Sequence, residues 1–323
     1  MKKSILTIMF FVFGILVSYA QDTIVRPLNV CDSNFIVRIF QSGENNAITD
    51  VKGVSVGHLS LDDGGDMHTG VTAILPHLGN LYQKKTPAAI YLANGGVNLA
   101  GYPFVKEFGY IETPVILTNT LNVAEGIRSA VTYTLNQFGN ENVKMVNSVV
   151  CGIPDGATNN VRARYVTDKH ILEAIKNANS GVVEQGAVGA GSGAVSFGKK
   201  GGIGTSSRVL PESFGGYTIG VLVVANFDGA PQSSCTIIVA TDAPLGAGQL
   251  ERLAKRAYKG IAKKCNLSDV NREDCVIAFS VYKDNLINID TRYYFPTLLQ
   301  NKHLSPIFQA AEEAVAEAVA SLF

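Results

Sequence analysis

The tripeptide Ser-Ser-Cys at 233–235 carries hydroxyl and thiol groups of the kind that nucleophilic catalysis uses. It lies between two apolar runs, at 217–225 and 236–240. Neither run alternates polar with apolar residues, so each is predicted to be a strand buried on both faces. A hydroxyl at the mouth of such a strand is held rigidly, as a nucleophile requires. The local sequence alone favours a simpler alternative, a hairpin loop built on Asp-Gly at 228–229.

Strands and amphipathic helices alternate along the rest of the chain. Further strands are predicted at 47–58, 69–75, 88–92, 114–117, 146–151 and 275–281. Apolar residues recur at helical spacing at 123–138, 167–175, 250–261 and 305–322. No repeat or linker divides these elements, so we predict a single α/β domain at 21–323.

The composition predicts a large buried core and excludes one class of partner. The chain has 323 residues, of which 46% are hydrophobic and 17% are charged. Its 27 basic residues balance 27 acidic ones, and no basic stripe is present. Nucleic acid is therefore excluded as a partner, and small molecules or peptides remain.

Residues 1–20 have the layout of a secretory signal peptide. Lys2 and Lys3 precede an apolar run at 5–17, and Ser-Tyr-Ala then stands before Gln21. The run is shorter than the ~20 residues that a spanning helix needs. We therefore predict cleavage before Gln21, no membrane association afterwards, and a periplasmic or secreted bacterial protein.

No pattern indicates a metal or a cofactor. The three histidines near predicted strand ends, His58, His68 and His77, lack helical spacing and acidic partners. The glycine-rich segment at 186–205 superficially matches a dinucleotide fingerprint, but glycines interrupt the helix that must follow one. We therefore predict no metal and no nucleotide cofactor.

The five cysteines are too few for a disulfide framework. Cys265 and Cys275 bracket a polar loop. They are predicted to form either a bridge in an oxidising compartment or two buried free thiols.

Seven segments, in this order, resemble the DmpA/BapA family of self-processing L-aminopeptidase D-esterases and β-peptidyl aminopeptidases. They are NAITDVKGVSVGH, the NGG and LAG turn at 94–101, PVILTNT, VGAGSGAVSFGKKGGIGTSSR, YTIGVLVVAN, IIVATDAPL and FQAAEEAVAEAV. The resemblance runs from Asn46 to the C-terminus. It implies an αββα sandwich of the N-terminal-nucleophile-hydrolase type, which needs no cofactor.

The resemblance also implies which residues carry the reaction. The family's nucleophile falls on Ser234, and the Asn of its VxAN motif, which helps to hold the oxyanion, is Asn226. The Lys of its FGxKGG motif is Lys200. The acid before its AFS strand, which supports the nucleophile, is Asp274.

The substrate end departs from the family's pattern. Asn98 replaces a Glu that would anchor the substrate amine, Leu121 replaces a Tyr, and Arg272 replaces a Ser. The family's ETNDG segment is GIPDG at 152–156. We predict that Asn98, Leu121 and Asn94 bind a substrate that differs from the family's usual ones.

A serine at a chain terminus carries its own base, because an α-amino group is partly neutral near pH 7. We therefore predict self-cleavage into 21–233 and 234–323. The predicted function is a serine aminopeptidase or amidohydrolase for short N-terminal peptides, amino-acid amides or esters, assembled as a homo-oligomer. Two alternatives are an acyltransferase of the ornithine acetyltransferase type and a non-catalytic homologue with a binding role.

Overall fold

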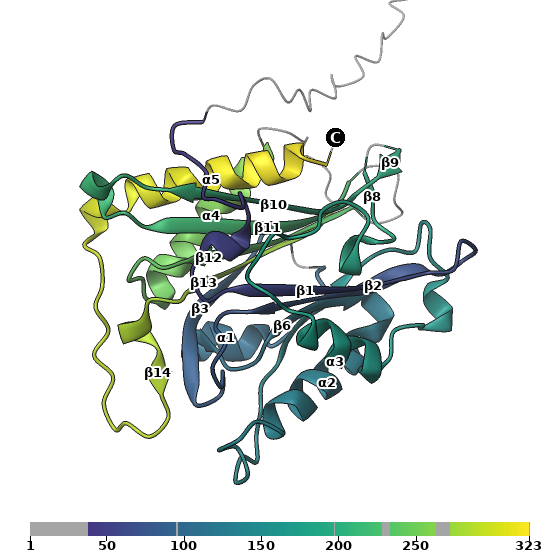
Figure 1. Cartoon of the computed structure of the whole chain (residues 1–323), viewed down its shortest axis with the longest axis horizontal. Coiled ribbons are helices and arrows are strands. Elements are labelled where there is room, and N and C mark those ends of the chain that lie inside the picture. The colour runs from purple at the N-terminus through teal and green to yellow at the C-terminus, as the bar shows by residue number, and fades with distance from the viewer. Residues whose placement is uncertain (1–37, 95, 197, 228–232, 263–271, 323) are drawn as a thin grey trace, which may run out of the picture. The chain divides into compact units, whose positions relative to one another are not determined.

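Figure 1 shows the computed structural model of the chain, which describes residues 38–94, 96–196, 198–227, 233–262 and 272–322. The predicted signal peptide and Cys265 lie outside these residues. The described residues all belong to one compact unit. None of the helices within them is long and apolar enough to cross a bilayer.

Helices and strands occupy most of the described chain. The α-helices are α1 (Tyr102–Phe108), α2 (Val123–Leu135), α3 (Asp168–Lys176), α4 (Ala247–Ala262) and α5 (Ser305–Ala320). The strands are β1 (Ser55–Asp62), β2 (His68–Leu75), β3 (Lys84–Leu92), β4 (Leu99–Ala100), β5 (Tyr110–Ile111), β6 (Val115–Asn119), β7 (Val149–Ile153), β8 (Val195–Ser196), β9 (Lys199–Lys200), β10 (Gly202–Val209), β11 (Thr218–Asn226), β12 (Ser234–Thr241), β13 (Glu273–Ser280) and β14 (Ile287–Asn288).

Two sheets form the centre of the fold, and helices cover their outer faces. The first sheet has the order β1-β2-β6-β7-β4, and the second has the order β10-β11-β12-β13-β3-β14, with β5 beside β3. Helices α2 and α3 pack on the first sheet, while α4 and α5 pack on the second (Figure 1). The predicted αββα sandwich is confirmed.

The central strands are apolar throughout because they are buried on both faces. In β11, Ile219, Val221 and Val223 face the core under α4 and α5, whereas Leu222 and Val224 face the core between the sheets. Strand β12 is also buried along its whole length. The two strands pair antiparallel, as a hairpin requires, and the turn residues 228–232 lie outside the described chain.

The glycine-rich segment contains a strand that the sequence did not predict. Strand β10 begins at Gly202, where φ is +135° and a Cβ would lie 1.9 Å from Gly186 O. A glycine is needed there because the backbone of one segment presses against that of another. The glycines thus serve close approach within the chain, and they hide the strand pattern.

Candidate active site

Ser234 is the first residue of β12 and lies between two strands of the second sheet. Asn226 of β11 pairs with it on one side, and Glu273 of β13 pairs with it on the other. The residue is only 3% exposed, and its hydroxyl has no hydrogen-bond partner among the described residues. Buried hydroxyls are rarely left unpaired, because this costs free energy. The hydroxyls of Ser55, Thr86 and Ser129 are likewise buried and unpaired among the described residues, so the position between Asn226 and Glu273 is what makes Ser234 the candidate for the reacting group.

Asn226 ties this point to two other segments. Its Oδ1 accepts a hydrogen bond from Val195 N at 2.8 Å, and its Nδ2 donates to Pro154 O at 2.7 Å. Val195 belongs to the glycine-rich segment, and Pro154 follows β7 of the other sheet. These bonds orient the amide of Asn226 beside Ser234, and a preoriented amide is what an oxyanion site uses.

Asp274 does not face the hydroxyl of Ser234. In the β12–β13 register it pairs with Cys235, which lies in the core under α4 and α5. Its carboxylate accepts bonds from Arg272 Nε at 2.8 Å, Arg272 Nη2 at 3.1 Å and Tyr258 OH at 2.8 Å. The acid predicted to support the nucleophile is therefore held in an ion pair on the opposite face of the sheet.

Glu273, which the sequence analysis did not single out, is the acid on the same face of the sheet as Ser234. Neighbouring residues of a strand point to opposite faces, so Glu273 shares the face of its partner Ser234. A Cβ on Gly96 would lie 3.4 Å from Glu273 Cγ, which places this side chain against the turn at 94–101. Burial raises the pKa of Glu273. The sequence shows two adjacent acids at 273–274, but a shift of one residue in the strand changes which of them shares the face of Ser234.

Lys200 is exposed and is connected to Asn226 through Val195. It pairs with Val195 in the β8–β9 hairpin, and Val195 in turn holds Asn226. The pKa of Asp62 is lowered mainly by a hydrogen bond from Gly64 N, with a smaller contribution from Lys200. The charge of Lys200 is thus felt at the end of β1.

Two hydrogen bonds show where the predicted substrate residues lie. Asn98 Nδ2 donates to Thr120 O at 2.9 Å, which joins the 94–101 turn to the segment that carries Leu121. The Leu121 residue is 50% exposed. Ala93 N, next to Asn94, donates to Asp274 O at 3.0 Å, so this end of the turn lies beside β13. The fold therefore brings Asn98 close to the segment of Leu121, while Asn94 lies beside β13, the strand that contains Glu273.

Asp155, in the GIPDG segment, is a second acid that the sequence interpretation left without a role. It is 2% exposed, and Thr69 Oγ1 donates to its Oδ2 at 2.7 Å, while Asn119 and Asn159 donate to its Oδ1. Burial raises its pKa. Because Pro154 O accepts from Asn226, this buried carboxylate braces the segment that holds the amide.

Two buried thiols lie beside Thr236, two residues along β12 from Ser234. Cys275 is a free thiol whose Sγ lies 3.7 Å from that of Cys151, and Thr236 Oγ1 lies 3.4 Å from Cys151 Sγ. The predicted alternative of a buried free thiol thus describes Cys275. No group of three or more His, Cys, Asp or Glu side chains in the described part of the chain could hold a metal ion.

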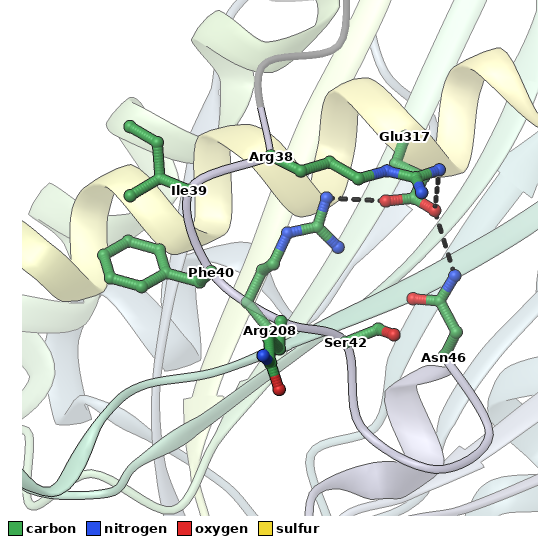
Figure 2. Close-up of a pocket in the computed structure, with 8 residues that line it drawn as sticks. Arg38, Ile39, Phe40, Ser42, Asn46, Arg208 and Glu317 are labelled. Atoms are coloured by element: carbon green, nitrogen blue, oxygen red, sulfur yellow. Dashed lines mark hydrogen bonds and ion pairs between the residues drawn. The ribbon is translucent and has the colours of Figure 1, made fainter.

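A polar cavity of about 570 Å³ lies elsewhere, between the segment that starts at residue 38 and helix α5. Figure 2 shows its network, in which Glu317 accepts hydrogen bonds from Arg38, Arg208 and Asn46. The charged groups satisfy one another there, and none of the predicted site residues lines the cavity. It therefore stands apart from the candidate site.

Comparisons with known proteins bear on the fold and the family. Beta-peptidyl aminopeptidase BapA of Sphingosinicella microcystinivorans is 33% identical over 87% of this chain and 81% of its own. The Burkholderia sp. beta-aminopeptidase structure has a TM-score of 0.82 and 33% identity, covering 88% of each chain. The Ochrobactrum anthropi L-aminopeptidase D-Ala-esterase/amidase, described as a variant of the Ntn hydrolase fold, has a TM-score of 0.81 and 31% identity, covering 88% and 87%.

The family assignment follows from the extent of these matches. The profile of peptidase family S58 matches residues 46–323. The resemblance drawn from the motifs is confirmed, and neither the acyltransferase nor the non-catalytic alternative is favoured. The chain therefore belongs to peptidase family S58, and it is a hydrolase of the serine aminopeptidase and amidase type.

Proposed function

We propose that the chain is a self-processing aminopeptidase whose nucleophile is Ser234. One observation carries the proposal: the Ser234 hydroxyl is buried, has no hydrogen-bond partner among the described residues, and lies between Asn226 and Glu273. A rigid strand start holds it in place, so little orientation remains to be gained when the reaction begins.

Self-cleavage begins with attack of Ser234 Oγ on the carbonyl carbon of Ser233. An ester forms as the C–N bond between the two residues breaks, and the hydroxyl proton passes to the departing nitrogen. Water then hydrolyses the ester, which leaves a carboxylate on Ser233 and a free amino group and hydroxyl on Ser234. Glu273 N donates to Ser233 O at 2.9 Å. That bond strengthens as negative charge develops on the oxygen, which supports the proposal.

In turnover, the new α-amino group is the base that takes the proton of the Ser234 hydroxyl. Its ordinary pKa of ~7.7–8.0 leaves part of it neutral near pH 7. Asn226 donates to the oxyanion, where loss of one such donor typically costs about 3–4 kcal/mol of barrier. The Glu273 carboxylate lies on the same face and orients the amino group. Lys200 adds positive charge at the outer edge, and Asp274 acts indirectly by holding Arg272.

The substrates that we propose are short peptides, amino-acid amides or esters with a free amino terminus. The relatives' names, with β-peptides for one and a D-Ala ester or amide for another, favour a small amino-terminal unit. Asn98 is neutral, so it offers an ammonium only an ordinary hydrogen bond. A charge-assisted bond is about twice as strong. The preference should therefore differ from that of enzymes with an acid there.

We further propose that the enzyme is exported, with cleavage before Gln21, and acts in the periplasm or outside the cell as a homo-oligomer. The layout of residues 1–20 supports export. Intact masses test export and self-cleavage together, because a fully processed protein consists of the pieces 21–233 and 234–323.

The decisive experiment compares three proteins by denaturing gel, intact mass and amide hydrolysis. The wild type should give two pieces and be active. Ser234→Ala should remain one chain and be inactive, whereas the matched control Cys235→Ala should still process, because its side chain faces the opposite core. Wild-type protein that stays full length yet hydrolyses amides would overturn the mechanism.

A further inference from the structure

Phe227, Ser233 and Arg272 each lie one residue beyond the end of a strand, at neighbouring ends of β11, β12 and β13. Ala225 pairs with Cys235, Cys235 pairs with Asp274, and all three side chains face α4 and α5. Two residues further along each strand, the same register aligns Phe227, Ser233 and Arg272, in keeping with the bond from Glu273 N to Ser233 O. Ser233 is 6% exposed.

Arg272 reaches across this row. Its guanidinium carbon lies 4.9 Å from the centroid of the Phe227 ring, although the two residues come from strands on either side of β12. Both residues are buried, with exposures of 0% for Phe227 and 3% for Arg272. The guanidinium and the ring therefore cover Ser233 on the face opposite to the Ser234 hydroxyl.

Asp274 and Tyr258 fix the position of the Arg272 guanidinium. Asp274 accepts two bonds from it, and Tyr258 of α4 donates to the same carboxylate. A planar guanidinium can form a two-point ion pair with an acid and still stack on an aromatic face, which a lysine ammonium cannot do. Because burying an ion pair has a desolvation cost, the pair is weak evidence for a purely stabilising role.

We propose that Arg272 and Phe227 form a clamp over Ser233 that positions the 233–234 peptide bond for attack by Ser234. The inference rests on the self-processing part of the proposed function. The clamp fixes one side of the scissile carbonyl, the Glu273 N–H fixes its oxygen, and the hydroxyl approaches from the other side of the sheet. Arg272 and Phe227 are positioning residues, because neither touches the reacting atoms.

The clamp is a property of this chain and not of the shared motif, because Arg272 stands where the resemblance leads us to expect a serine. Orientation matters in this step because no free α-amino group exists before cleavage, so proximity must supply most of the rate. A misplacement of about 1 Å can slow such a reaction about a hundredfold.

The test compares Phe227→Leu with Phe279→Leu. Both phenylalanines are fully buried, but Phe279 lies at the far end of β13 in the core between the sheets. Each purified precursor is refolded, its thermal melt is measured by circular dichroism, and the rate of cleavage is followed on a denaturing gel. Phe227→Leu should process about tenfold more slowly or worse, whereas Phe279→Leu should process at the wild-type rate with a similar loss of stability.

Equal rates for the two variants, or rates that follow their melting temperatures, would overturn the clamp. If Phe227→Leu does not fold, Arg272→Lys keeps the test open, because it retains the charge but loses the two-point pair and the stack. A wild-type rate for folded Arg272→Lys would contradict the inference. Wild-type protein that never processes would instead refute the proposed function, so the two failures are distinguishable.

Discussion

Asn98 and Ser234 differ in how much of their hydrogen-bonding capacity the fold uses. Asn98 Nδ2 is engaged by Thr120 O, and its backbone oxygen accepts from Gly152 N at 2.8 Å. The hydroxyl of Ser234, by contrast, has no hydrogen-bond partner among the described residues. In the proposed function, the first residue belongs to the substrate side of the site and the second is the reacting group.

Replacing Asn98 by Glu should strengthen the binding of substrates with a free α-ammonium, since a carboxylate adds a charge-assisted bond. The expected change is a roughly tenfold lower KM with a smaller change in kcat, which corresponds to about 1.4 kcal/mol. Asn98→Gln is the neutral control, and an N-acetylated substrate should show no gain. Unchanged KM values in Asn98→Glu would mean that this position does not contact the amine.

Strand β13 separates two neighbouring acids by face. Glu273 shares the side of Ser234, and Asp274 binds Arg272 and Tyr258 under α4. Neutralising each carboxylate should therefore change a different property of the protein, although the two residues are adjacent in sequence.

We expect Glu273→Gln to lower kcat with little change in melting temperature, and Asp274→Asn to lower the melting temperature. The second change leaves Arg272 buried without its counter-charge, which typically costs about 3–5 kcal/mol. Burial raises the pKa of Glu273, and in the proposed mechanism its ionised form orients the α-amino group. Wild-type activity should thus be lost as pH falls through that raised pKa, and Glu273→Gln should lack this step. The reverse pattern in the two variants would return the supporting role to Asp274.

The sequence was sufficient for elements whose apolar pattern is long and uninterrupted. Strands β11 and β12 and helices α2 to α5 were predicted because burial on one or both faces dictates their periodicity. The sequence was insufficient where contacts between distant segments of the chain determine the structure. Strand β10 was not predicted because its glycines are required by close contact with the backbone of other segments, which the local sequence does not reveal. Glu273 was not singled out because the register between β12 and β13 decides which acid shares the face of Ser234.

At the scale of the whole molecule, the proposed cut divides the strands of the second sheet between the two pieces. The piece 234–323 supplies β12, β13 and β14 with α4 and α5, while 21–233 supplies β10, β11 and β3. Strands β12 and β13 lie between β11 and β3, so the smaller piece is inserted into the sheet of the larger one. Each piece completes the hydrogen bonding and the core of the other.

The two pieces should therefore remain together after cleavage and separate only in denaturant. Native mass spectrometry should find them in equal numbers, whereas a denaturing gel should resolve them. The fragment 234–323 made alone should not fold, because β12 loses its bonds to β11 and β13 loses those to β3, and such exposed strand edges favour aggregation. Co-expression with 21–233 should restore folding, measured by circular dichroism and a cooperative melt. A cooperative melt of isolated 234–323 would contradict this dependence, because a fragment that folds alone does not need the larger piece to complete its sheet.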